Sequence, residues 1–112
     1  VKWVNYPGFE DHPCHGIAKA QFKDRGFGTM LTFGLENEQA CFSFIDNLAM
    51  ILNLANLGDC KTLVIHPWST QYISFPKETR QALSDPCLIR LSVGIEHIDD
   101  ICADLDRALS KI

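Results

Sequence analysis

The chain has 112 residues, of which 46% are hydrophobic and 21% charged, and its formal net charge is −4 at pH 7. This length and balance are ordinary for a single globular domain with a modest core. The negative charge argues against a nucleic-acid or anionic-membrane surface as a partner. In the sequence, no apolar run approaches the roughly 20 residues of a transmembrane helix.

The first half of the chain contains two predicted strands and two predicted helices. A strand at 3–6 is followed by a helix that Asp11 is expected to cap and that runs over 11–23. Residues 29–35 alternate between apolar and polar and predict a second strand. Residues 36–56 carry a wide apolar stripe that predicts the longest helix. Further apolar residues outside that stripe predict an additional contact with another domain or subunit.

The second half repeats this order. A strand at 62–66 precedes a short helix at 76–83, which has Pro76 in its first turn. A last strand at 88–93 leads through Gly94 into a helix at 98–112. The element order predicts an α+β fold, a two-layer sandwich in which a four-stranded, mostly antiparallel sheet carries helices on one face.

Arg90 is the sharpest candidate for a functional residue. Alternation along 88–93 puts Ile89, Leu91 and Val93 on one face and Arg90 with its polar neighbours on the other. A guanidinium at a fixed strand position can bind a carboxylate through two hydrogen bonds. The alternative is a structural salt bridge to an acid elsewhere in the domain, and the residues alone favour that alternative because such pairs are common.

Metal binding and cysteine chemistry have weaker signals. His12, Cys14 and His15 lie close together, but no second ligand pair has the spacing of a metal site, so no metal is expected. Cys60 follows a turn and precedes a lysine, yet the sequence places no general base beside it. The glycines at 26 and 28 lack the spacing of a phosphate-binding loop.

The cysteines are five in number, far apart, and include no Cys-x-x-Cys pair: Cys14, Cys41, Cys60, Cys87 and Cys102. This pattern argues against a disulfide framework and a zinc ribbon. We expect most of them to be reduced, small hydrophobic residues of a cytoplasmic protein.

Two segments are highly particular: LIRLSVGIEHIDDI at residues 88–101 and KTLVIHP at residues 61–67. With further matches at 4–8, 26–33, 44–48 and 53–59, they resemble the Cys/Met-metabolism family of pyridoxal-phosphate enzymes, and within it most closely the O-acetylhomoserine sulfhydrylases. The resemblance implies that residues 1–112 are the small C-terminal domain of a fold-type-I transferase whose large, cofactor-binding domain is absent from this chain. The start at Val1, directly within a strand pattern, agrees with a fragment.

The resemblance also implies an activity. Such enzymes use pyridoxal phosphate to convert O-acetyl-L-homoserine and sulfide or a thiol into homocysteine or methionine plus acetate, and they are usually homotetramers. Arg90 matches the arginine that binds the substrate α-carboxylate, and Thr62 matches a small hydroxyl residue lining the same site. The family's cofactor-binding lysine motif is missing, so the chain is expected to hold no catalytic, cofactor-binding or metal-binding residue and to be inactive alone.

Several alternatives stay open. The chain could be a non-catalytic small-molecule-binding or oligomerisation domain, or part of another transsulfuration enzyme such as a cystathionine synthase or lyase. Trp68 and Tyr72 replace residues that are usually alanine and histidine in the family, which leaves the substrate preference open. Partial exposure of the helix predicted at 36–56 would let the fragment self-associate.

Overall fold

The computed structural model describes residues 1–23 and 25–112. Its centre is a five-stranded mixed sheet of order β1-β2-β5-β4-β3, in which β3 and β4 are parallel and the other neighbours antiparallel. The strands are β1 (Trp3–Asn5), β2 (Met30–Gly34), β3 (Leu52–Asn53), β4 (Leu63–Ile65) and β5 (Leu88–Ser92). The helices are α1 (His15–Phe22), α2 (Glu38–Asp46), α3 (Lys77–Leu83) and α4 (Ile98–Leu109). The predicted α+β fold is confirmed, with one strand more than expected.

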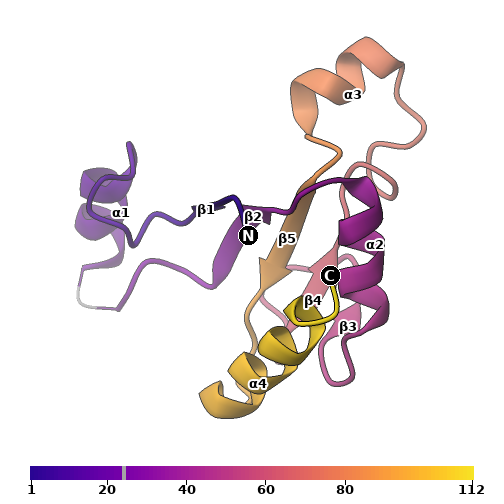
Figure 1. Cartoon of the computed structure of the whole chain (residues 1–112). Helices are drawn as coiled ribbons and strands as arrows, with labels where there is room; N and C mark the ends of the chain where they lie inside the picture. Colours follow the sequence, from indigo (N-terminus) through magenta and orange to yellow (C-terminus); the bar gives the residue numbers. More distant parts are fainter. Residues whose placement is uncertain (24) are drawn as a thin grey trace.

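Helices α2 and α4 pack beside one another and cover one face of the sheet (Figure 1). The core between these layers holds the alternate apolar residues of the central strands, among them Phe33, Ile89 and Leu91. The ring of Phe33 meets that of Phe44 on α2 edge to face, with centroids 5.6 Å apart. Helices α1 and α3 lie away from this layer (Figure 1). The face opposite α2 and α4 is also partly covered, since Leu63 and Ile65, which point to it, are each 2% exposed.

The prediction of a helix at 36–56 is wrong for the second half of that range. Helix α2 starts after Asn37, whose side chain accepts a hydrogen bond from the Ala40 amide at 2.9 Å, and it ends at Asp46. The chain then turns and forms β3, the strand that the sequence did not predict. Ile51 is buried, as the apolar stripe implied, but it is not helical. Apolar spacing alone could not separate these two outcomes.

Asp104 on α4 is the physical reason for this turn. Its carboxylate is 6% exposed and accepts hydrogen bonds from the backbone amides of Ala49, Met50 and Ile51 at 2.9, 3.0 and 2.9 Å. The side chain of Arg107, one turn later on α4, also donates to it. Three consecutive amides aimed at one carboxylate cannot at the same time donate to helix carbonyls, so the helix cannot continue.

The first helix also differs from its prediction. It starts at His15 and not at Asp11, while its end near residue 23 is as expected. The turn before it is held by His12, whose Nδ1 accepts a hydrogen bond from the Cys14 amide at 3.1 Å. Within residues 1–23 and 25–112, none of the helices has both the length and the apolarity that crossing a membrane requires.

The pKa of Asp104 yields a test of this interaction. Burial raises the pKa of this carboxyl, but the hydrogen bonds from Ile51, Ala49, Arg107 and Met50 outweigh burial and lower it to about 2, from an ordinary 3.8. Because the folded-state pKa is depressed, the ionised carboxylate stabilises the fold above about pH 4, and this contribution is lost as the pH falls towards 2. A shift of this size corresponds to about 2 kcal/mol at neutral pH.

We therefore expect Asp104→Asn to lower the free energy of unfolding at pH 7 by at least about 2 kcal/mol. The difference between the wild type and the variant should shrink between pH 5 and pH 2, because the wild type loses its charge there. Urea unfolding across this pH range measures both effects. Asp106→Asn, at an exposed position of the same helix, is the matched control. A difference that stays constant with pH would contradict the role of the ionised carboxylate.

Candidate functional site

Arg90 lies in the middle of the central strand β5, on the face opposite α2 and α4. Its backbone pairs with Thr32 on β2 and with Ile65 on β4, so these three side chains share one face of the sheet. Ile89 and Leu91 point to the other face and belong to the core. The predicted alternation of this strand is therefore confirmed, with Arg90 on the side that the main helical layer leaves uncovered.

Arg90 lines a pocket of about 150 Å³ on this face. The pocket combines a few polar groups with apolar walls, as small-molecule sites commonly do. Its polar side chains come from four parts of the chain, namely β2, the segment after β4, the end of α3 and β5, and they are Thr32, Gln71, Tyr72, Ser84 and Arg90.

The Arg90 guanidinium has no acidic partner within the described part of the chain. One of its terminal nitrogens donates to Oε1 of Gln71 at 3.1 Å, and this acceptor carries no charge. The ion pairs among residues 1–23 and 25–112 join Lys2 with Glu36, His97 with Asp99, and Arg107 with Asp104. A structural salt bridge, the alternative that the residues alone favoured, is thus not formed by the described residues.

Partial burial changes the pKa of the Arg90 guanidinium. Burial lowers the pKa of the Arg90 guanidinium, and the nearby Tyr72 opposes that shift. Arginine nevertheless stays protonated at any physiological pH. The pocket therefore contains a permanent, partly desolvated positive charge whose remaining N–H groups are available to an anion.

His66 holds the segment that brings Gln71 and Tyr72 to Arg90. Its ring is 1% exposed, with Nε2 2.8 Å from the carbonyl oxygen of Pro86 and Nδ1 2.8 Å from the hydroxyl of Ser69. A carbonyl only accepts, so Nε2 carries the proton and donates to Pro86. This bond ties the end of β4 to the start of β5. His66 is thus a structural residue with both nitrogens satisfied.

The two residues that depart from the family pattern have different places. Trp68 is 7% exposed and lies under the guanidinium of Arg80, which is 3.8 Å from the ring centroid. Tyr72, in contrast, lines the Arg90 pocket.

Thr62 is not brought together with Arg90. It precedes β4, and strand alternation places its side chain on the side of Val64, which belongs to the core, whereas Arg90 shares a face with Ile65. Thr62 is fully buried, and its hydroxyl donates to Oε2 of Glu96 at 2.7 Å. The hydroxyl oxygen of Thr62 in turn accepts a hydrogen bond from the Gly94 amide at 2.9 Å. The Thr62 backbone amide donates to Oε1 of Glu96 at 2.7 Å, and this bond, followed by that from the Thr62 hydroxyl, lowers the pKa of Glu96.

The structure adds two pocket residues that the sequence interpretation did not name, Thr32 and Gln71. Thr32 had a signal, because alternation already put it on the polar face of the strand at 29–35. What was missing was the pairing register that places it opposite Arg90. Gln71 lies in the segment without a clear period, and nothing in the sequence pointed to its contact with Arg90.

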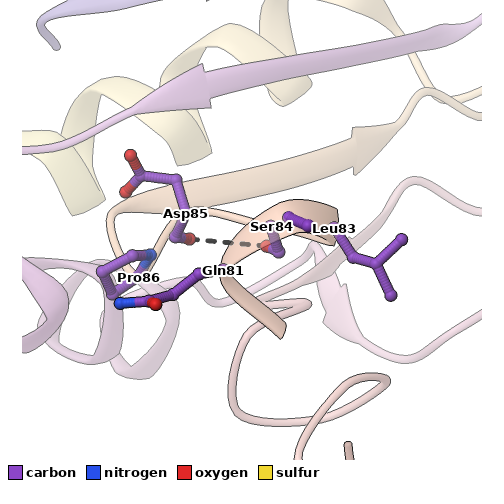
Figure 2. A pocket seen from close by; sticks show the side chains of 6 residues that line it. Gln81, Leu83, Ser84, Asp85 and Pro86 are labelled. Carbon is purple, nitrogen blue, oxygen red and sulfur yellow. Dashed lines mark hydrogen bonds between the residues drawn. The ribbon is translucent and has the colours of Figure 1, made fainter. Parts of the chain in front are cut away.

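A larger hollow lies beside the end of α3 (Figure 2). It measures about 460 Å³ and is lined by residues 81–86. Figure 2 shows the local hydrogen bond in its wall, which the Ser84 hydroxyl donates to the backbone carbonyl of the next residue, Asp85; its length is 3.4 Å. Its single charged side chain is the carboxylate of Asp85, so an anion would be repelled. The smaller pocket at Arg90 is the better candidate for an anionic ligand.

The histidines near the N-terminus do not form a metal site. Nε2 of His12 lies 2.8 Å from the side-chain oxygen of Asn5, and Nδ1 of His15 donates to the carbonyl oxygen of Pro7 at 2.9 Å. Within the ranges 1–23 and 25–112, no group of three or more His, Cys, Asp or Glu side chains is placed to hold a metal ion.

Comparison with known proteins places the chain in a family. The sequence profile of the Cys/Met metabolism PLP-dependent enzymes matches residues 1–110, and the chain belongs to this family. It is 47% identical over 112 residues to O-acetyl-L-homoserine sulfhydrylase 1 of Thermus thermophilus, covering 98% of this chain and 26% of the relative. It is 44% identical over 115 residues to L-methionine gamma-lyase of Fusobacterium nucleatum subsp. polymorphum, covering 100% and 28%.

A solved structure agrees with this family assignment. A protein of Campylobacter jejuni, assigned as an O-acetylhomoserine (thiol)-lyase and holding N′-pyridoxyl-lysine-5′-monophosphate, superposes with a TM-score of 0.88 at 35% identity. The match covers 97% of this chain and 26% of that one. The chain thus spans about a quarter of the length of the relatives it matches.

The residues of the Arg90 pocket do not themselves fit pyridoxal phosphate. Enzymes of this kind hold the cofactor through a lysine amine, and no lysine lines the pocket among the described residues. The pocket offers a single cation and hydroxyl and amide groups, which suit a carboxylate better than a cofactor with its phosphate. The lining of this pocket therefore suits a carboxylate group and not the whole cofactor.

The placement of Thr62 leads to a second test. We expect Thr62→Val to lower the free energy of unfolding by about 1–3 kcal/mol, because Glu96 and the Gly94 amide lose a buried partner. Denaturant unfolding of the variant measures this loss, with Thr29→Val at an exposed position as the matched control. A Thr62→Val protein with wild-type stability would contradict the structural role of this hydroxyl.

Proposed function

We propose that the chain is the C-terminal small domain of a pyridoxal-phosphate enzyme of the O-acetylhomoserine sulfhydrylase type. Its family, its similarity to such enzymes over 98% of its length, and its coverage of 26% of the Thermus thermophilus relative support this proposal. The full-length protein would then contain a large domain that holds the cofactor. We further propose that it assembles as a homotetramer, which light scattering of the full-length protein would test.

The proposed role of this domain is to bind the α-carboxylate of the amino-acid substrate through Arg90. The observation that carries it is a partly buried guanidinium, open to a pocket, with no acidic partner among the described residues. Gln71 occupies one of its nitrogens and so fixes the plane of the fork. A carboxylate held by such a fork can no longer rotate freely, which fixes the orientation of the adjacent α-carbon for reaction.

The proposed reaction is replacement of the acetyl group of O-acetyl-L-homoserine by sulfide or a thiol, giving homocysteine or methionine and acetate. One finding favours a second candidate, since the identity to a methionine gamma-lyase is nearly as high as that to the sulfhydrylase. The full-length protein distinguishes them. The sulfhydrylase consumes O-acetyl-L-homoserine only when sulfide or a thiol is present, whereas the lyase degrades methionine without a sulfide or thiol acceptor.

We expect Arg90→Lys in the full-length protein to lower kcat/KM for the amino-acid substrate by about 10- to 100-fold, mainly through a higher KM. The reason is that a lysine offers a point charge in place of a two-pronged fork, and a charge-assisted hydrogen bond contributes about 1.5–3 kcal/mol. Steady-state kinetics with varied substrate measures the change.

Arg25→Lys is the matched control, because it makes the same substitution at an exposed position outside the pocket. Thermal unfolding of both variants separates a folding defect from a binding defect. Wild-type kinetics of Arg90→Lys would overturn the assignment of the carboxylate site to Arg90.

A further inference from the structure

A row of polar side chains crosses the face of the sheet opposite α2 and α4, from β1 to Arg90 on β5. Asn5 on β1 pairs with Thr32 on β2, and Thr32 pairs with Arg90 on β5. Thr32 is thus flanked by Asn5 on one side and by the guanidinium on the other. It also lines the same pocket as Arg90.

The hydrogen bonds that reach Thr32 have a defined direction. The Cys14 amide can only donate, so Nδ1 of His12, at 3.1 Å, is the acceptor and the neutral ring carries its proton on Nε2. Nε2 then donates to Oδ1 of Asn5 at 2.8 Å. This fixes the orientation of the Asn5 amide.

The orientation of the Asn5 amide determines how it bonds to Thr32. Its Nδ2 donates to Oγ1 of Thr32 at 3.2 Å, so the Thr32 oxygen is an acceptor on the β1 side. A hydroxyl has one hydrogen to donate, and the hydrogen of Thr32 is not used by Asn5. It is left for the pocket side, where the free N–H groups of Arg90 also lie.

We infer that the Thr32 hydroxyl is a second donor of the Arg90 carboxylate site, and that Asn5 and His12 are positioning residues that aim it. This inference rests on the proposed function of Arg90. A carboxylate has two oxygens, each with acceptor capacity for more than one donor. Donors from two neighbouring strands specify the position of such a group better than the guanidinium alone.

The test uses the full-length protein and two ligands that differ only in the carboxylate. L-Norleucine is an amino acid without a leaving group, and pentylamine is the same molecule without its carboxylate. Thr32→Val keeps the shape of the side chain and removes the hydroxyl. We expect it to raise the dissociation constant for norleucine about tenfold in calorimetric titration, and to leave pentylamine binding unchanged.

Two further measurements separate this effect from a structural one. Thr32→Ser retains the hydroxyl and should retain most of the norleucine affinity. In kinetics, Thr32→Val should raise KM more than it lowers kcat, because Thr32 contacts the carboxylate and not the reacting bonds. Its melting temperature should stay close to wild type, since the Asn5 amide is exposed and can bond to water.

The positioning role of Asn5 has its own test. In Asn5→Asp the new carboxylate can only accept, so the Thr32 hydroxyl should turn to donate to it and be lost to the ligand. We expect Asn5→Asp to weaken norleucine binding by a larger factor in the wild-type background than in Thr32→Val, because the hydroxyl is already absent there. An equal factor in both backgrounds would reflect only the added charge and would overturn the positioning role.

Failure of this inference is distinguishable from failure of the proposed function. If Arg90→Lys weakens norleucine binding while Thr32→Val does not, the role of Thr32 is overturned and that of Arg90 stands. If neither variant changes norleucine binding, the carboxylate site itself is overturned. If Thr32→Val weakens norleucine and pentylamine equally, the hydroxyl does not act on the carboxylate, and the inference is again overturned.

Discussion

The arrangement of the fold depends on one buried carboxylate. Asp104 accepts three consecutive backbone amides, from Ala49 to Ile51, and thereby ends the helical course of the chain and sends it into β3. Because α4 follows β5 directly, the same contact joins the last helix to the far edge of the sheet. Without it, the parallel pair of β3 and β4 would lose its main tether, since two strand residues cannot hold an edge by themselves.

Strand periodicity predicted much of this structure, because it is a local property of the backbone. Alternation in residues 29–35 and 88–93 correctly assigned the core face and the polar face, and it placed Arg90 opposite the main helical layer. The end of α2 and the turn at residues 47–51 were not predictable in this way. The carboxylate that causes it lies more than fifty positions later, at Asp104, and an apolar stripe reads the same for a helix and for a buried turn.

The candidate site shows the same division. The residue type and position of Arg90 could be inferred from the sequence, but its neighbours depend on which strands pair and in which register. The sequence interpretation grouped Thr62 with Arg90. Strand alternation places Thr62 on the face of Val64, which is opposite the face that Arg90 shares with Ile65. Thr32 and Gln71 reach Arg90 from β2 and from a turn that has no periodicity. Long-range pairing is set by the whole fold, and no local pattern encodes it.

The position of Asn5 on β1 has a consequence for the energetics of the pocket. β1 is a three-residue strand at the edge of the sheet, and all its residues are exposed. Edge segments of this kind open at a small free-energy cost, well below that of global unfolding. Under the inference that Asn5 positions Thr32, molecules with β1 undocked keep Arg90 but lose the positioned hydroxyl, so the apparent affinity for a carboxylate would be the population-weighted affinity of the docked and undocked forms. On this inference, the docking free energy of β1 would contribute to the carboxylate affinity of a pocket that β1 itself does not line.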